Sequence, residues 1–296
     1  MIYTLTCNPA LDYLMQVDEL RPGETNRSVQ DAFRFGGKGI NVSAVLARLG
    51  VATTALGFVA GFTGDAFSRA VCAAGIPADF IRLRQGHTRV NVKLKGQTET
   101  EINAAGPHIS ADALTQLYSK LAALTTGDTL VLAGSVPPSL PQDLYGQIMA
   151  LLSGRGVRFV VDATGDQLLC TLPYKPFLIK PNRRELEGLV GRPLPDDASL
   201  INAARELQTQ GAENVLVSLG GDGALLVDTT GRVRRAPAIR VDVTDTVGAG
   251  DSMVAGFLAG YAQGSDYALR LGNAAGAATA ASPHLASREA IMELLK

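Results

Sequence analysis

Short apolar runs alternate with amphipathic stretches along nearly the whole chain. The runs are rich in β-branched residues and predict strands at residues 2–6, 54–59, 129–133, 158–161, 177–179, 214–218 and 224–227. Several of these runs are apolar throughout, which is typical of parallel strands covered on both faces. We therefore expect them to lie side by side in the interior of one sheet.

Helical periodicity falls between these runs. Apolar residues spaced i, i+3 and i+4 predict helices over residues 42–49, 114–124, 144–152 and 254–261. Strands that alternate with helices predict an α/β fold, with three α/β/α layers around a mainly parallel sheet. Ligands of such sheets bind at the carboxyl ends of the strands.

Two segments interrupt this alternation. Residues 12–34 hold short alternating stretches around a Pro-Gly turn, and residues 88–104 alternate polar and apolar positions on both sides of Gly96. The period of two predicts a β-hairpin in the second segment. We expect the two segments to form a small projecting sheet, the lid, on a single domain of residues 1–296. Its apolar face would need cover from the substrate or from a second copy of the chain.

Composition narrows the classes of function. Hydrophobic residues make up 46% of the chain and charged residues 19%, as in ordinary globular proteins. The net charge is −1 and the sequence has no basic cluster, so it gives no support for a nucleic-acid partner. The three cysteines are far apart without a C-x-x-C pair, so we expect no disulfide framework and a cytoplasmic location. No signal-like start and no apolar stretch of about 18 residues is present, so no membrane partner is expected.

A glycine-rich segment, Thr246-Val247-Gly248-Ala249-Gly250-Asp251, stands just ahead of the last helical stripe. The glycines therefore lie at a helix N-terminus, where the first N–H groups are free and the helix dipole favours an anion. A phosphate at these amides, with Asp251 taking a proton from an attacking hydroxyl, is the functional interpretation. An ordinary Asp cap after a glycine turn is the structural alternative.

A second glycine-rich turn, Gly36-Gly37-Lys38-Gly39-Ile40-Asn41, leads into the first helix. Its glycines allow a ligand to approach the backbone, while Lys38 and Asn41 supply a charge and an amide. Neither a Walker A loop nor G-x-G-x-x-G occurs, which argues against a dinucleotide. A glycine turn with a solvated lysine is the alternative.

Polar residues also follow several predicted strands. Asp12 is placed to accept hydrogen bonds from sugar hydroxyls, or is only a turn residue. Asn182 and Glu185 share a helix face, where Glu185 would orient Mg²⁺ directly or through water, unless the pair is a capping box. The turn at 218–223 is either a plain hairpin turn or a backbone lining for a nucleotide.

Together these motifs resemble those of the ribokinase-like carbohydrate kinases, the phosphofructokinase-B family. One family signature corresponds to residues 36–50, another to residues 245–252, and the Asn182-x-x-Glu185 pair lies between them. The resemblance runs nearly from end to end, and the segments 4–12 and 88–93 are most similar to the 1-phosphofructokinase branch.

The resemblance implies transfer of the γ-phosphoryl group of Mg·ATP to the C6 hydroxyl of fructose 1-phosphate. Tagatose-6-phosphate kinase and 6-phosphofructokinase are alternatives within the family, and a non-catalytic nucleotide-binding regulator is an alternative of another class. Two lid sheets packing together would make a homodimer.

It also implies roles for individual residues. The implied catalytic residues are Asp251, Gly248, Ala249 and Gly250. The sugar phosphate is assigned to Asp12, Gly37, Lys38, Asn41, Arg89 and Ser135. The nucleotide is assigned to Lys180, Asn182, Glu185, Ser218, Gly220, Gly223, Thr246 and Asn273, with Glu185 holding Mg²⁺ through water.

Overall fold

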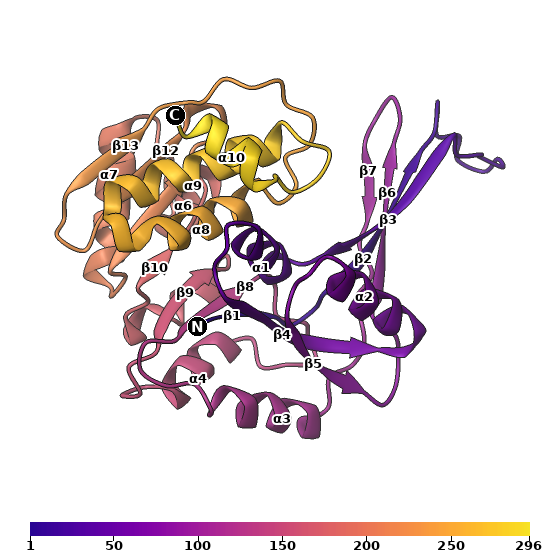
Figure 1. The fold of residues 1–296 in the computed structure, drawn as a ribbon, viewed down its shortest axis with the longest axis horizontal. Coiled ribbons are helices and arrows are strands. Elements are labelled where there is room, and N and C mark those ends of the chain that lie inside the picture. Colours follow the sequence, from indigo (N-terminus) through magenta and orange to yellow (C-terminus); the bar gives the residue numbers. More distant parts are fainter.

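A nine-stranded sheet forms the centre of the computed structural model, which describes residues 1–296 (Figure 1). The strand order is β13-β12-β11-β10-β9-β8-β1-β4-β5, parallel from β5 to β11 and antiparallel at β12 and β13. The strands are β1 Ile2–Thr6, β4 Thr53–Ala60, β5 Ala78–Leu83, β8 Thr129–Ala133, β9 Arg158–Asp162, β10 Leu178–Ile179, β11 Asn214–Ser218, β12 Ala224–Val227 and β13 Val233–Ala236.

Helices cover both faces of this sheet, so the predicted three-layer α/β/α fold is confirmed (Figure 1). One layer contains α1 Lys38–Arg48, α2 Gly61–Ala73, α8 Ala249–Gly260, α9 Ser265–Ala280 and α10 Arg288–Leu294. The other contains α3 Ala111–Leu121, α4 Leu144–Leu151, α6 Arg183–Val190 and α7 Asp197–Thr209. Short turns complete the chain: α5 Asp166–Leu169, η1 Leu172–Tyr174, η2 Gly220–Asp222 and η3 Tyr261–Gln263. None of these helices has the length and hydropathy needed to cross a bilayer.

All seven predicted strands are present, whereas the two edge strands β5 and β13 were not predicted. Their sequences explain this, because Asp79 and Arg82 interrupt β5 while Arg234 and Arg235 occupy the middle of β13. An edge strand exposes one side to water and tolerates such residues. The predicted helix over 114–124 was displaced towards the C-terminus, since α3 begins at Ala111 and ends at Leu121.

The lid is a separate four-stranded sheet that projects beside the main body (Figure 1). Its order is β3-β2-β6-β7, with β2 Ala10–Gln16, β3 Gln30–Gly36, β6 Arg89–Lys95 and β7 Thr100–Ile102. The hairpin predicted within residues 88–104 is present as β6 and β7. The parallel pairing of β2 with β6 joins it to the hairpin β2–β3.

The two faces of the lid differ in chemistry. Register places Asp12 of β2 opposite Arg34 of β3 and Asn91 of β6, so these polar residues share one face. The next position pairs Tyr13 with Phe33, whose rings stack with centroids 4.3 Å apart. Phe33 is 61% exposed. The lid therefore presents polar groups on one face and leaves aromatic surface uncovered on the other.

Candidate active site

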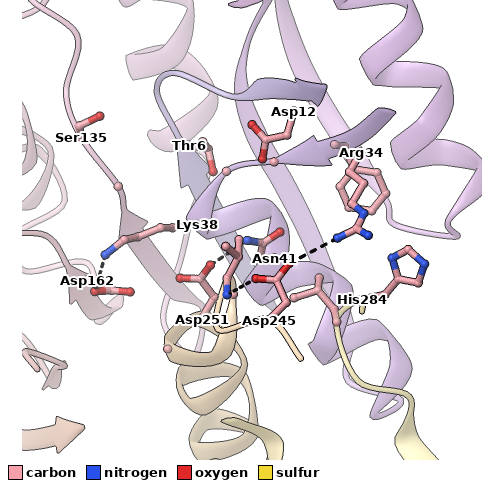
Figure 2. Close-up of a pocket in the computed structure, with 18 of the residues that line it drawn as sticks. Thr6, Asp12, Arg34, Lys38, Asn41, Ser135, Asp162, Asp245, Asp251 and His284 are labelled. Carbon is pink, nitrogen blue, oxygen red and sulfur yellow. Dashed lines mark hydrogen bonds and ion pairs between the residues drawn. The ribbon is translucent and has the colours of Figure 1, made fainter. Parts of the chain in front are cut away.

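A cavity of about 990 Å³ lies between the lid and the carboxyl ends of the parallel strands (Figure 2). The structure brings together there most of the residues that the sequence singled out. The lining includes Asp12, Gly37, Lys38, Asn41, Arg89, Ser135, Lys180, Asn182, Glu185, Ser218, Gly248, Gly250 and Asp251. Five assigned residues are not part of the lining: Gly220, Gly223, Thr246, Ala249 and Asn273.

The loop before α8, residues 245–250 (the anion loop), opens towards this cavity. Gly248 has φ +79°, and a side chain there would place its Cβ 2.6 Å from Leu285 Cδ2. The amide of Ala249 donates to the carbonyl of Thr246 at 3.2 Å, whereas the amides of Gly248 and Gly250 make no hydrogen bond within the protein. Free amides at the N-terminus of the 12-residue helix α8 form a ready anion site.

Asp251 lies in the first turn of α8 beside these amides and is only 6% exposed. Its Oδ2 accepts a hydrogen bond of 2.8 Å from Nδ2 of Asn41, which comes from α1 (Figure 2). Burial raises the pKa of Asp251 to about 6, and the negative charge of Asp162 adds to this. The Asn41 hydrogen bond and the charges of Lys38 and Lys180 act in the opposite direction. A carboxylate with this pKa is ionised at neutral pH yet basic enough to accept a proton.

Two lysines share one carboxylate on the floor of the cavity. Asp162, the last residue of β9, is 1% exposed, and its Oδ1 lies 3.1 Å from Lys38 Nζ and 3.5 Å from Lys180 Nζ. Burial alone would raise the pKa of Asp162, but the two ammonium groups outweigh it and lower the pKa. Burial likewise opposes the charge on Lys38, while Asp162 and Asp251 raise its pKa. Lys38 is therefore held charged beside the anion loop, and Lys180 Nζ approaches the same carboxylate oxygen.

A second group of charges occupies the lid side. Arg89, the first residue of β6, is anchored through Nε to the carbonyl of Asn8 at 3.1 Å. Burial lowers its pKa, and the charge of Asp12 opposes that effect. Asp12 accepts a 2.8 Å hydrogen bond from Asn91 Nδ2, and its other oxygen lies 3.9 Å from Lys93 Nζ. Hydrogen-bond donors and acceptors thus face the cavity from the lid.

The residues assigned to the nucleotide cluster where β10 and β11 end. Asn182 and Glu185 form a capping box at the start of α6, with both hydrogen bonds 2.8 Å long. Both residues also line the cavity, and the capping box engages only Oε2 of Glu185, which leaves Oε1 without a hydrogen bond in the protein. Gly223 serves the tight hairpin between β11 and β12, where a Cβ would collide with the carbonyl oxygen of Ala236. Asn273 Nδ2, on α9, donates to the carbonyl oxygen of Pro237 at 2.9 Å.

Several lining residues were missed from the sequence. Asp162 directly follows the strand predicted at residues 158–161, so the strand-end rule that selected Asp12 applies to it equally. Lys93 lies on the same strand of the predicted hairpin as Arg89, at a spacing that places both on one face. Arg34 and His284 carried no local signal, because only the folded lid and C-terminal loop bring them to the cavity (Figure 2).

Comparison with known proteins agrees with this geometry. A model of the pfkB family carbohydrate kinases matches residues 6–290. A 1-phosphofructokinase from Bacillus subtilis is 43% identical over 100% of this chain and 97% of its own length. A D-tagatose-1-phosphate kinase from Bacillus licheniformis is 36% identical over 96% of this chain and 94% of its own.

Structural comparison leads to the same family. Phosphofructokinase-2 from Escherichia coli, solved in complex with substrates and products, superposes with a TM-score of 0.93 at 30% identity, covering 99% of this chain and 98% of that one. The chain therefore belongs to the pfkB family of carbohydrate kinases, which are phosphotransferases acting on a sugar hydroxyl.

Proposed function

We propose that this chain transfers the γ-phosphoryl group of Mg·ATP to the C6 hydroxyl of fructose 1-phosphate, giving fructose 1,6-bisphosphate. One observation carries the proposal: Asp251, with a pKa of about 6, lies beside free helix amides in a cavity lined by lysine and arginine. The full-length similarity to a 1-phosphofructokinase supports the choice of acceptor.

In this mechanism Asp251 accepts the proton of the attacking hydroxyl. The Asn41 hydrogen bond holds the carboxylate in place, so that one oxygen remains for the substrate. The amides of Gly248 and Gly250 at the start of α8 donate to the transferred phosphoryl oxygens, where negative charge builds up. Fixed donors of this kind need no reorganisation during the reaction, which is why they lower the barrier.

The cations of the cavity would bind two different substrates, the sugar phosphate and the nucleotide. Arg89 and Lys38 bind the phosphate that the sugar already carries, and the planar guanidinium of Arg89 suits bidentate contact. Asp12, Gly37, Asn41 and Ser135 border the space for the sugar hydroxyls. Lys180, whose Nζ lies 3.2 Å from the position of a Cβ on Gly250, binds the nucleotide phosphates next to the anion loop.

The cavity fits a Mg²⁺ ion that arrives with the nucleotide. Mg²⁺ in kinases is held by substrate phosphates, waters and one or two carboxylates. Glu185 offers a free oxygen at the rim, and Asp162 Oδ2 is buried without a hydrogen-bond partner. Glu185 would hold the ion through water. Bound Mg²⁺ neutralises charge on the triphosphate.

The remaining assignments concern the nucleotide. Ser218 borders the cavity, whereas Gly220, Gly223, Thr246 and Asn273 do not line it. Contact of these four with ATP therefore stays a prediction, as does donation from the engaged amide of Ala249.

We also propose that two lids pack through their aromatic faces in a homodimer. Phe33 and Ile102 are 61% and 59% exposed on that sheet, and an apolar patch of this kind marks an interface. The polar lid face would then close over the substrate and exclude water. A cytoplasmic location, expected from the three separated cysteines, stays a prediction.

An assay of ADP release with purified protein, Mg·ATP and a panel of sugars and sugar phosphates tests the proposal. Fructose 1-phosphate is expected to give the highest kcat/KM. A higher kcat/KM for tagatose 1-phosphate, tagatose 6-phosphate or fructose 6-phosphate would identify that compound as the acceptor and leave the proposed mechanism unchanged. No ADP release with any acceptor would favour a non-catalytic regulator.

A further inference from the structure

One carboxylate joins the lid to the anion loop. Asp245, the first residue of that loop, is only 15% exposed, and its two oxygens have different partners. Oδ1 accepts a 3.0 Å hydrogen bond from the amide of Val247. Oδ2 lies 3.4 Å from Lys95 Nζ. The same oxygen lies 3.7 Å from Arg34 Nη1 (Figure 2). Both cations belong to lid strands, Lys95 to β6 and Arg34 to β3.

The hydrogen bond on Oδ1 fixes the turn that precedes Gly248. Val247 directly precedes the residue whose positive φ turns the free amides towards the cavity. Rotation of the Asp245 side chain would release the Val247 amide and loosen this turn. The orientation of the catalytic amides therefore depends on how firmly the Asp245 carboxylate is held.

The contacts on Oδ2 hold that carboxylate only while the lid lies over the cavity. Lys95 and Arg34 approach it from two strands of the lid, so movement of the lid as a body would separate both pairs together. We propose that Arg34 and Lys95 are positioning residues that act through Asp245, so that closing the lid completes the anion loop. This rests on the proposed function, because the loop is taken to receive the transferred phosphoryl group.

Replacing either cation should slow phosphoryl transfer without weakening substrate binding. An ion pair that is partly exposed is worth less than about 1 kcal/mol, so K95M and R34M should each lower kcat about 2- to 5-fold. The KM values for ATP and for the sugar phosphate should change less than about 2-fold, because neither side chain is assigned to a substrate. K95R should restore most of the lost rate.

Two substitutions of Asp245 separate its two oxygens. D245N keeps an acceptor for the Val247 amide but loses the charge, so it should match the K95M/R34M double variant in kcat. D245A loses both partners and should be slower still. Adding K95M to D245N should change nothing further, because the pair is already broken.

The matched control is E99Q. Glu99 is 75% exposed and is the other carboxylate near Lys95, at 3.9 Å, so its replacement changes the charge beside Lys95 without touching Asp245. E99Q is expected to have unchanged kcat. Thermal unfolding of every variant shows whether it is folded. If D245A does not fold, the comparison of D245N with the D245N/K95M double variant still tests the inference.

Three outcomes would overturn the inference. The first is an unchanged kcat in K95M and R34M, and the second is a kcat in the D245N/K95M double variant that is lower than in D245N by the full factor seen for K95M alone. The third is a rise in the KM for the sugar phosphate alone. The third would mean that the cations bind substrate directly. The wild-type protein, assayed in parallel, keeps the two proposals apart. Absence of wild-type ADP release would refute the proposed function, whereas failure of the variants beside an active wild type would refute only the role of Asp245.

Discussion

Replacing Asp251 by asparagine should cost activity and at the same time make the fold more stable at neutral pH. The two side chains have nearly the same shape, and the amide oxygen of the variant can still accept the hydrogen bond from Asn41. The general base is lost, so kcat should fall about 10²- to 10⁴-fold. Since the carboxylate must be ionised to act, wild-type kcat should decline as pH falls through about 6.

The gain in stability follows from the pKa of Asp251. Burial raises this pKa from 3.8 to about 6, so between these values the folded state holds a proton that the unfolded state has lost. Wild-type stability therefore decreases as pH rises through this window. About two pKa units correspond to roughly 3 kcal/mol, and the D251N variant would not lose this stability because an amide does not titrate.

Urea unfolding of both proteins between pH 4 and pH 8 measures this difference. The stability of D251N relative to wild type should increase by up to about 3 kcal/mol from pH 4 to pH 7 and then stay level. D112N is a suitable control, because Asp112 lies in the first turn of α3 on the exposed surface, away from the cavity. A flat difference across the pH range would refute the buried-charge argument, and wild-type turnover in D251N would refute the role of Asp251 as base.

Three further predictions concern other parts of the site. The Gly248→Ala variant should have lower activity and a free energy of unfolding that is lower by about 1–2 kcal/mol, because an alanine at φ +79° is strained and its Cβ meets Leu285. Gly188→Ala, where the space around the Cβ is open, is the control in the same urea experiment. Arg89→Ala should raise the KM for the sugar phosphate about 10- to 100-fold with a much smaller change for ATP, and an unchanged value would exclude this residue from the phosphate site. Phe33→Glu should convert a dimer to a monomer in light scattering, whereas Phe62→Glu, 80% exposed on α2, should leave the mass unchanged; a wild-type monomer would contradict the lid interface.

The sequence predicted the layers and the main groups of the site because their signals are local. A buried parallel strand such as β8 is apolar at nearly every position, and a glycine followed by an apolar helical stripe marks the start of α8. Edge strands lack such a signal, because solvent on one side admits arginine and aspartate. The capping box of Asn182 and Glu185 was one of two interpretations of the same spacing, and the structure shows it while leaving both residues at the cavity.

What the sequence left unassigned depends on contacts between distant segments. Arg34 and Asp245 lie in opposite halves of the chain, and nothing near either residue indicates that they meet. The same holds for Asn41 and Asp251, which were assigned separately to sugar and catalysis and are hydrogen-bonded to each other. Pairings of this kind arise from the packing of α1 against α8 and of the lid against the loop, which no local pattern encodes.

The arrangement of charges explains how one cavity can hold several anions and still contain a usable base. Lys38 and Lys180 are paired to Asp162, which sets their positions before any phosphate binds. The same carboxylate acts on Asp251 by repulsion and helps to keep its pKa near 6. Without the negative charge of Asp162, the pKa of the base would be lower and its proton affinity weaker. Asp162 therefore serves two purposes at once: it organises the cations that bind phosphate and limits their effect on the group that accepts the proton.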